Sequence, residues 1–267
     1  MTPSMYLPKD YDLFVGLDVD KNSFSFTIKD HHWMNQSKKI PSEPEQLHHY
    51  MKNHFAGKKV LYAYEAGPTG YHLHDYLAEK NEDCVVVSPL SIPKAPNQRV
   101  KNNRLDSQKI VDELRAGKLT SIRVPQGQYR ELRHLINLRE NYVYHRKASK
   151  QRIKALLLYA HLDHVLKDVE QNWSNCYIQA LKKISCSPAE RQRLDMLLMD
   201  LEYARKQTLL VLRQLRDLVK NSADIQQNMK YLESLPGIGF IAAITVLGRM
   251  GDPKYSKNVR ELSAFLG

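Results

Sequence analysis

The fold is decided by the stretch YDLFVGLDVDKNSFSFTI, which covers Tyr11–Ile28. Its first half alternates as a β-strand does, with Phe14, Gly16 and Asp18 on one face and apolar residues on the other. The segment Ser23–Ile28 repeats this period of two, and the polar residues between the two halves suit a tight turn. The stretch therefore predicts a β-hairpin.

Strands and helices alternate after this hairpin. Ser42 and Glu45 have the spacing of a capping box and predict the start of a helix. The further elements predicted here are a strand over Lys59–Glu65, a helix over Tyr71–Glu79, a strand over Cys84–Val87 and a helix over Arg104–Ala116. A hairpin followed by strand–helix units predicts the α/β class, with a mixed sheet flanked by helices.

The pattern becomes helical throughout from about Tyr129. Apolar residues recur at spacings of three and four over Leu132–Ala160 and again over Leu194–Leu218. This spacing predicts two long helices, either paired as an antiparallel coiled-coil arm or packed in a bundle. We expect a looser link near Ser185–Pro188 to join them.

Positive charge is concentrated in one part of the chain. The 267 residues carry a formal net charge of +11, and residues 123–160 hold nine Lys and Arg against two Asp and Glu. Such a basic stretch is typical of a surface that binds a polyanion, and a solvated helix face has the same composition. The residues that we expect to contact nucleic acid here are Arg139, Arg146, Lys147, Lys150, Arg152 and Lys154.

The remaining composition indicates a protein of the cytoplasm. Cys84, Cys176 and Cys186 form neither a metal-binding motif nor a disulfide framework. No apolar run approaches the ~18 residues of a membrane span, and the first ten residues lack a signal pattern. We therefore expect no membrane partner.

Three acidic residues stand where their neighbours predict burial. Asp18 and Glu65 end apolar strands, and Asp106 opens a helix. Buried carboxylates are costly unless they are paired or bind metal, and hard oxygen ligands suit Mg²⁺. Each acid also has a structural explanation, since Asp18 could cap a turn, Glu65 could pair with a lysine, and Asp106 could complement the helix dipole.

Several motifs follow one another in the order and at the separations of one family. They are GLDVDK at Gly16–Lys21, YEAGPTG at Tyr64–Gly70, KNNRLD at Lys101–Asp106 and LPGIG at Leu235–Gly239. With them the chain resembles the insertion-sequence transposases of the IS-one-ten type, which include the pilin-gene invertases. The resemblance implies a RuvC-like domain of the RNase H type with a D-E-D-D metal set, a long helical arm and a C-terminal domain with a serine nucleophile.

The resemblance assigns roles to four positions. Asp18, Glu65 and Asp106 would be catalytic and would bind Mg²⁺ or Mn²⁺. The third acid of the set falls at Asn103, which would also be catalytic and can still offer its amide oxygen to a metal, although without charge. We therefore expect weaker Mg²⁺ binding than in a four-acid site.

Two nearby acids are poor substitutes for the missing one. Asp112 lies about 240° around the helix from Asp106, and Glu113 lies about 10 Å along the helix axis. Neither is expected to join the metal set.

The resemblance also implies partners. These are DNA, a structured guide (bridge) RNA and further copies of the chain in a dimer or tetramer. Lys101 and Arg104 stand beside the acids, and the backbone at Gly237 and Gly239 would approach a phosphate as helix termini do. The segment Leu235–Gly239 resembles a helix-hairpin-helix element.

The expected domains are a RuvC-like catalytic domain over 1–125, a helical arm over 126–225 and the beginning of the C-terminal transposase domain over 226–267. Family members continue beyond this point, so we expect the C-terminal domain to be incomplete and its serine nucleophile to be absent. Other hypotheses are a nucleic-acid-binding remnant without catalysis, a RuvC-like Holliday junction nuclease, and an actin-like kinase or ATPase. The last would need further phosphate-binding glycine loops, which the sequence lacks.

Overall fold

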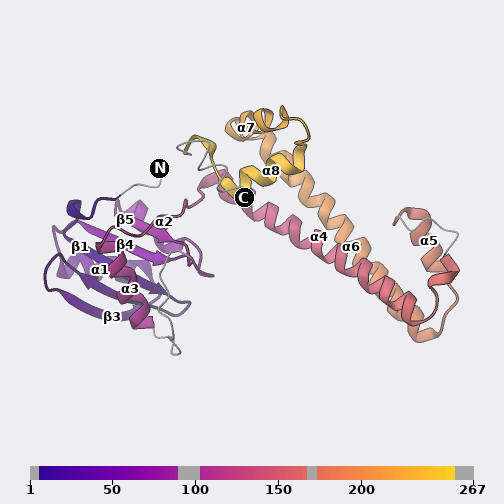
Figure 1. The fold of residues 1–267 in the computed structure, drawn as a ribbon, viewed down its shortest axis with the longest axis horizontal. Coiled ribbons are helices and arrows are strands. Elements are labelled where there is room, and N and C mark those ends of the chain that lie inside the picture. Colours follow the sequence, from indigo (N-terminus) through magenta and orange to yellow (C-terminus); the bar gives the residue numbers. More distant parts are fainter. Residues whose placement is uncertain (1–5, 90–102, 167–172, 256–267) are drawn as a thin grey trace. The chain divides into compact units, whose positions relative to one another are not determined.

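The computed structural model describes residues 6–89, 103–166 and 173–255, and the side chains of residues 103, 104, 165, 166 and 255 are outside the description. The chain divides into two compact units, Met1–Val124 and Pro125–Gly267 (Figure 1). The first unit contains a sheet and the second is helical.

A five-stranded mixed sheet forms the centre of the first unit. Its strand order is β3-β2-β1-β4-β5, with β1, β4 and β5 parallel and β2 antiparallel to both of its neighbours. The strands are β1 (Leu13–Val19), β2 (Ser23–Lys29), β3 (Asn35–Pro41), β4 (Val60–Glu65) and β5 (Asp83–Val87). The expected mixed sheet and its opening hairpin are therefore confirmed.

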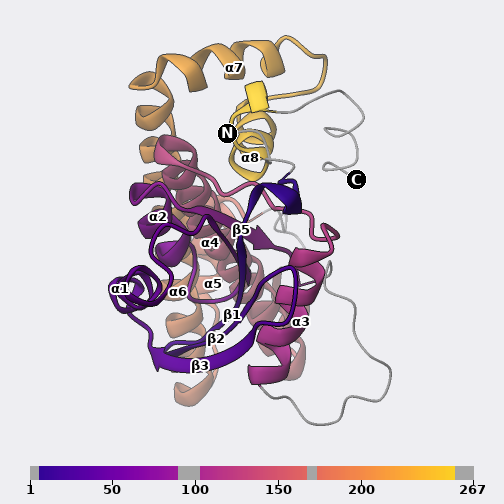
Figure 2. The ribbon, with the colours of Figure 1, turned by 90° about the vertical axis from the view of Figure 1, so that its left-hand side faces the viewer.

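Helices cover both faces of this sheet. Figure 2 shows α1 (Pro44–His54) and α2 (His72–Glu79) on one side and α3 (Asn103–Arg115) on the other. The first face carries a core that includes Val15, Leu17 and Tyr62. The second face carries the core residues Phe14, Leu61, Ala63, Val85, Val87, Ile110, Val111, Leu114 and Leu119. The short helix η1 (Pro8–Asp10) precedes β1.

The helix α3 lies directly on β1 at a glycine. A Cβ added at Gly16 would stand 2.4 Å from the backbone oxygen of Ser107 and 2.5 Å from the backbone nitrogen of Val111. Phe14 shares a core with Leu114, further along the helix. The helix therefore runs opposite to β1, and its first turn lies toward the carboxyl end of that strand.

Two long helices form most of the second unit. These are α4 (Gly127–Tyr159) and α6 (Pro188–Lys220), which lie side by side (Figure 1). Tyr129 shares a core with Val219, and Ile153 shares a core with Leu194. The two helices are therefore antiparallel, as the apolar spacing predicts. The shorter helices α5 (Asn175–Lys183), α7 (Ala223–Glu233) and α8 (Phe240–Met250) pack at their ends, with η2 (Asp163–Leu166) and η3 (Pro253–Tyr255) as short turns.

The core between the long helices is divided into two clusters. One cluster joins α4 and α6 to α7 and α8, and the other joins them to α5. Between the clusters α4 places Arg146, the buried Ser149 and Lys150, and α6 places Ala204 and the buried Thr208. The middle of the pair is thus more polar than its ends.

The local structure differs from the prediction in two places and contains one strand that was not predicted. The helix α1 has Glu43 as its N-cap without a side-chain cap, and the hydroxyl of Ser42 donates instead to the backbone oxygen of Lys21. The strand β3 escaped prediction because its residues are exposed apart from the half-buried Ile40, so they show no apolar alternation. The connection between the long helices is longer than a link at Ser185–Pro188, because it contains α5.

Candidate active site and nucleic-acid interface

Asp18 and Glu65 end two neighbouring parallel strands at the same level. The pairing of β1 with β4 runs from Leu13↔Val60 to Leu17↔Tyr64, so the next residues are Asp18 and Glu65. Gly16 and Ala63 face α3, and alternation places Asp18 and Glu65 on that same face. Asp18 is half-buried and Glu65 is exposed.

The first turn of α3 brings Asp106 to the same edge of the sheet. Asp106 is half-buried and directly precedes Ser107, which lies over Gly16. Because α3 runs opposite to β1, its first turn lies toward Asp18. Asn103 begins the helix, one turn before Asp106. The side chains of Asn103 and Arg104 are outside the description, and Lys101 lies outside the described residues.

Polar groups line the sheet beside these acids. Ser25, opposite Asp18 on β2, is 7% exposed, and Thr27 lies opposite Gly16. The Thr27 hydroxyl oxygen is 2.9 Å from the hydroxyl oxygens of both Ser37 and Ser107. These contacts tie α3 to the centre of the sheet by hydrogen bonds, so the first turn of α3 has a defined position above β1.

The described residues contain no group of three or more His, Cys, Asp or Glu side chains placed to hold a metal ion. The structure therefore brings Asp18, Glu65 and the backbone of Asp106 to one edge and one face, but it does not gather their side chains into a ready metal cage. The donor set is made of carboxylate oxygens, which are the ligands that Mg²⁺ prefers. The residue types fit the cation, and the side chains would have to converge on it.

Asp112, one of the two neighbouring acids of α3, has other surroundings. The Lys29 amine donates to both carboxylate oxygens of Asp112, at 2.7 and 2.8 Å. Arg115 lies 3.9 Å from the same carboxylate. Asp112 is thus held toward β2, in agreement with the prediction that it faces away from Asp106.

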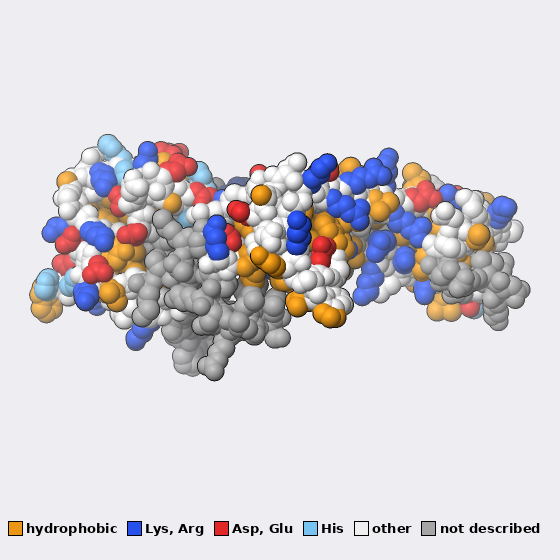
Figure 3. Space-filling model, turned by 90° about the horizontal axis from the view of Figure 1, so that it is seen from above, with side chains coloured by type: hydrophobic (Ala, Val, Ile, Leu, Met, Phe, Trp, Pro, Cys, Tyr) orange, Lys and Arg blue, Asp and Glu red, His pale blue; other side chains and the backbone are white. Residues whose placement is uncertain are grey.

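Lys and Arg side chains gather over part of the helical pair (Figure 3). On α4, Arg139, Arg146 and Lys150 are half-buried, whereas the predicted contacts Lys147, Arg152 and Lys154 are exposed. Burial lowers the pKa of Lys150, and the nearby charges of Arg146, Arg205 and Lys154 lower it further. Arg205 on α6 is not among the predicted contacts, because nothing in the helical pattern places it beside α4.

Not every basic residue of α4 is available to a ligand. The Arg133 side chain donates to the backbone oxygen of Gly248 at 3.0 Å and thereby joins α4 to α8. Arg130 donates to the backbone oxygen of Pro125 at 2.8 Å. These two arginines support the fold of the second unit.

The glycine hairpin forms the expected turn between two helices. Gly237 has a φ of +83°, a conformation that favours glycine. Gly239 is the N-cap of α8. A Cβ at either position would meet nothing within 4 Å, so the turn is open on its outer side.

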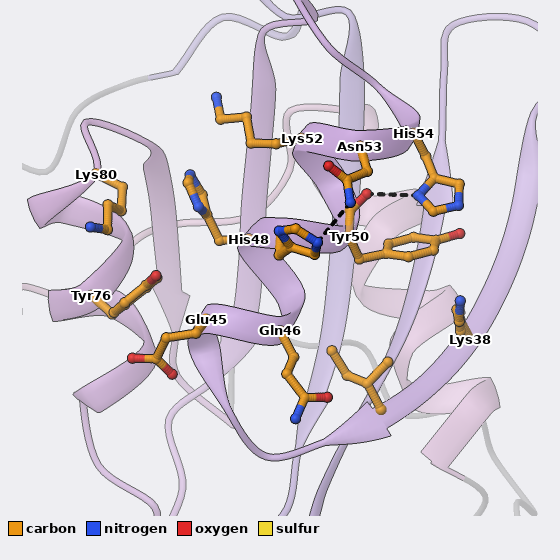
Figure 4. A pocket seen from close by; sticks show the side chains of 12 residues that line it. Lys38, Glu45, Gln46, His48, Tyr50, Lys52, Asn53, His54, Tyr76 and Lys80 are labelled. Carbon is orange, nitrogen blue, oxygen red and sulfur yellow. Dashed lines mark hydrogen bonds between the residues drawn. The ribbon is translucent and has the colours of Figure 1, made fainter.

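A pocket of about 800 Å³ lies on the outer side of α1 (Figure 4). Histidine, lysine and tyrosine side chains from α1, α2 and β3 line it. The Asn53 amide lies 2.8 Å from the His49 ring, and the Lys38 amine lies 4.0 Å from the centre of the Tyr50 ring. The α1 face of the sheet is opposite the face that carries Asp18, so this pocket is separate from the acidic edge.

None of the helices in the described part of the chain is long and apolar enough to cross a membrane.

Family models match both parts of the chain. A model described as "Transposase", for the DEDD transposases of the IS110 (IS-one-ten) type, matches residues 15–161, which are more than half of the chain. A second model, described as "Transposase IS116/IS110/IS902 family", matches residues 229–267. The first match contains Asp18, Glu65 and Asp106, and the second contains the glycine hairpin.

Two curated proteins are similar to the chain. "Putative transposase y4qE" from Sinorhizobium fredii is 28% identical over 211 residues, which are 78% of this chain and 49% of that protein. "Transposase for insertion sequence element IS1533" from Leptospira borgpetersenii is 27% identical over 114 residues, which are 40% of this chain and 32% of that protein. The chain thus spans half or less of the length of these relatives.

Proposed function

The chain belongs to the IS110 family of insertion-sequence transposases, and we propose that it carries out Mg²⁺-dependent phosphodiester chemistry on DNA during recombination. The observation that carries this proposal is the placement of Asp18 and Glu65 at the ends of β1 and β4, on the face beneath the first turn of α3. The strand order and the family match agree with an RNase H-like domain over residues 1–125.

The carboxylates of Asp18, Glu65 and Asp106 would hold Mg²⁺ or Mn²⁺, with Asn103 offering an uncharged oxygen. When bound there, the cation would supply an activated water and charge stabilisation for the leaving oxygen in phosphodiester cleavage. The chain's own contribution is to fix these oxygens. The strand register sets Asp18 beside Glu65, and the packing of α3 on Gly16 sets the height of Asp106 above them.

Nucleic acid would be held by the basic residues. Lys101 and Arg104 precede Asp106, and the basic face of α4 offers charge to phosphates without reading sequence. The open turn at Gly237 and Gly239 would admit a phosphate to the start of α8. A structured guide RNA, assembly as a dimer or tetramer, coiled-coil packing of the arm and action in the cytoplasm complete the proposal.

A cleavage assay tests the chemistry. The wild-type chain and the variants Asp18→Asn and Glu65→Gln are incubated with branched DNA, with and without Mg²⁺, and nicked products are quantified. We expect Mg²⁺-dependent nicking by the wild type and a loss of at least about a hundredfold in each variant, because each loses a charged oxygen ligand. Glu79→Gln is the control, since Glu79 is an exposed acid at the end of α2. Equal nicking by all four proteins would contradict the assigned site.

A second candidate is a nucleic-acid-binding protein without cleavage. The absence of a three-ligand group among the described side chains and the presence of Asn103 favour it. Binding of the branched DNA without nicking in Mg²⁺ or Mn²⁺ would support this alternative. A four-way junction among the substrates tests the Holliday junction nuclease hypothesis, which expects that substrate to be cut in preference.

A further inference from the structure

The middle of the helical pair gathers four cations from two helices. Lys150 is the central one, and the charges of Arg146, Lys154 and Arg205 act on it. Arg146, Lys150 and Lys154 belong to α4, and Arg205 belongs to α6. We call these four residues the cross-helix cluster.

Trp173 contacts one residue of this cluster from each helix. The Lys150 amine lies 5.2 Å from the centre of the Trp173 ring, and the Arg205 side chain donates to the Trp173 backbone oxygen. Trp173 is 8% exposed and packs in the core that joins α4, α5 and α6. The cluster is therefore built on a buried ring and has a defined geometry, unlike lysines scattered over a surface.

The cluster lacks an ion-pair partner in the part of the chain that the structure describes. No Asp or Glu there forms an ion pair with any of the four, although other basic residues of α6 do find acids, as Arg191 does with Asp195. Burial lowers the pKa of Lys150 most, and the like charges of Arg146, Arg205 and Lys154 lower it further, so holding these cations together costs free energy. An arrangement that costs free energy in the empty protein is relieved by a bound anion.

The location of the cluster adds to this cost. It lies at the edge of the core that contains Trp173, next to the stretch around Ser149 and Thr208 where that core gives way to polar residues. The cations of the two helices therefore meet beside a stretch where buried polar residues, and not apolar ones, stand between α4 and α6. An anion bridging the two helices would stabilise this contact.

We propose that the cross-helix cluster is a phosphate-binding site that grips the phosphodiester backbone of a nucleic acid between α4 and α6, with Arg205 as a contact residue. The site rests on the proposed function and makes it more specific, because it names one place on the arm where the backbone lies. The guanidinium groups of Arg146 and Arg205 suit the oxygens of a phosphate, and the two lysines add point charges. Occupation of the site holds the middle of the helical pair together.

Trp173 provides a direct reporter of the site. The chain has two tryptophans, and Trp33 is 95% exposed. The substitution Trp33→Phe removes the emission of Trp33, so that all remaining tryptophan emission comes from Trp173. In this background the full chain is titrated with a 20-base-pair DNA duplex and with an RNA duplex of the same sequence. We expect saturable changes of Trp173 emission, because the ammonium group above its ring takes up a phosphate. The duplex that binds more tightly identifies the source of the backbone.

Two variants test the cluster by different routes. Lys154→Gln removes an exposed charge, and Arg205→Lys keeps the charge but loses the forked donor. Each should weaken duplex binding severalfold, and Lys154→Gln should lower the slope of log K against log salt by about one. Lys206→Gln is the matched control, because Lys206 is exposed and adjacent to Arg205 on α6. The melting temperature of the wild type should rise with bound duplex.

The outcomes separate this site from the proposed chemistry. Duplex binding with unchanged Trp173 emission, and with wild-type affinity and salt slope in both variants, would overturn the cross-helix site and leave the proposed function standing. A Trp173 response without any nicking would support the site and count against the proposed chemistry. Absence of duplex binding would overturn the site together with the nucleic-acid part of the proposed function.

Discussion

Gly16 lies directly beneath the backbone of Ser107, so closely that a Cβ on Gly16 would stand 2.4 Å from the Ser107 carbonyl oxygen. This contact sets the distance between β1 and α3, and with it the height of Asp106 above Asp18. A side chain at this position would have to push the helix away, since the obstacle is backbone.

The substitution Gly16→Ala should destabilise the first unit by about 1–3 kcal/mol, because overpacking here displaces a whole helix. The measurement is urea unfolding followed by circular dichroism. Gly67→Ala is the control, since a Cβ there would have its nearest neighbour at 3.9 Å, and we expect a change within about 0.5 kcal/mol. A Gly16→Ala protein as stable as the wild type would contradict the tight contact.

The substitution Asn103→Asp should strengthen Mg²⁺ binding, because it adds an anionic oxygen one helical turn from Asp106. We expect at least about a tenfold lower Kd for Mg²⁺, or ~1.4 kcal/mol, by isothermal titration calorimetry. Asn53→Asp adds the same charge on α1, where it should have no effect on Mg²⁺. Unchanged affinity in the Asn103→Asp variant would count against the metal site.

The N-terminus of α6 should respond to acid through its capping box. The Ser187 backbone nitrogen and hydroxyl donate to Glu190 Oε2 at 2.9 and 2.8 Å, and these hydrogen bonds lower the pKa of Glu190. A carboxyl whose pKa is lower in the folded state stabilises the protein above its unfolded pKa. That contribution is lost as the pH falls through the folded value.

Glu190→Gln should therefore reduce the loss of stability between about pH 5 and pH 3, measured as the urea midpoint of the helical signal. Ser187→Ala should cost ~1 kcal/mol at neutral pH through the lost N-cap. The same acid sensitivity in the Glu190→Gln variant as in the wild type would show that the pairing contributes nothing.

His48 should make the first unit less stable in mild acid. Its ring lines the pocket of Figure 4, with Nε2 3.7 Å from Glu82 Oε1. Burial lowers the pKa of His48, and Lys52 and Lys80 lower it further against the opposing effect of Glu82. The folded state thus binds this proton more weakly than the unfolded state. Its stabilising contribution is present above about pH 6.5 and is lost as the pH falls through the folded pKa.

The histidine prediction is checked by urea midpoints between pH 7.5 and pH 5. His48→Gln should flatten the decline, whereas His49→Gln, its exposed neighbour on α1, should retain the wild-type slope. Nuclear magnetic resonance titration of the His48 ring gives the pKa directly. A value above the ordinary range would reverse the expected slope.

The elements of the first unit follow from local sequence wherever one face is apolar. Strands β1, β2 and β4 alternate or run apolar, because their side chains must fill the cores on the sheet. The strand β3 has no such pattern, since it forms the edge of the sheet and its side chains are exposed. Its place depends on hydrogen bonding to β2, which is a tertiary property.

The acidic site divides in the same way. The positions of Asp18 and Glu65 at strand ends can be read from the sequence, because each follows an apolar run. That Asp18 and Glu65 lie side by side depends on the parallel pairing of β1 with β4, two strands that are separated in the sequence by β2 and β3. The approach of Asp106 to the ends of these strands depends on residue 16 being a glycine, because a Cβ there would collide with the backbone of α3.

The sequence by itself determined the family, the hairpin, the alternation of elements and the two long helices. These features depend on the spacing of residues and the order of motifs, which are local properties of the chain. Only the tertiary structure decided that Arg205 and Lys150 both contact Trp173, and that Asp112 is held by Lys29. The physical reason is that charges act over a few ångströms in space. Two residues 55 positions apart become neighbours only when the antiparallel helices close.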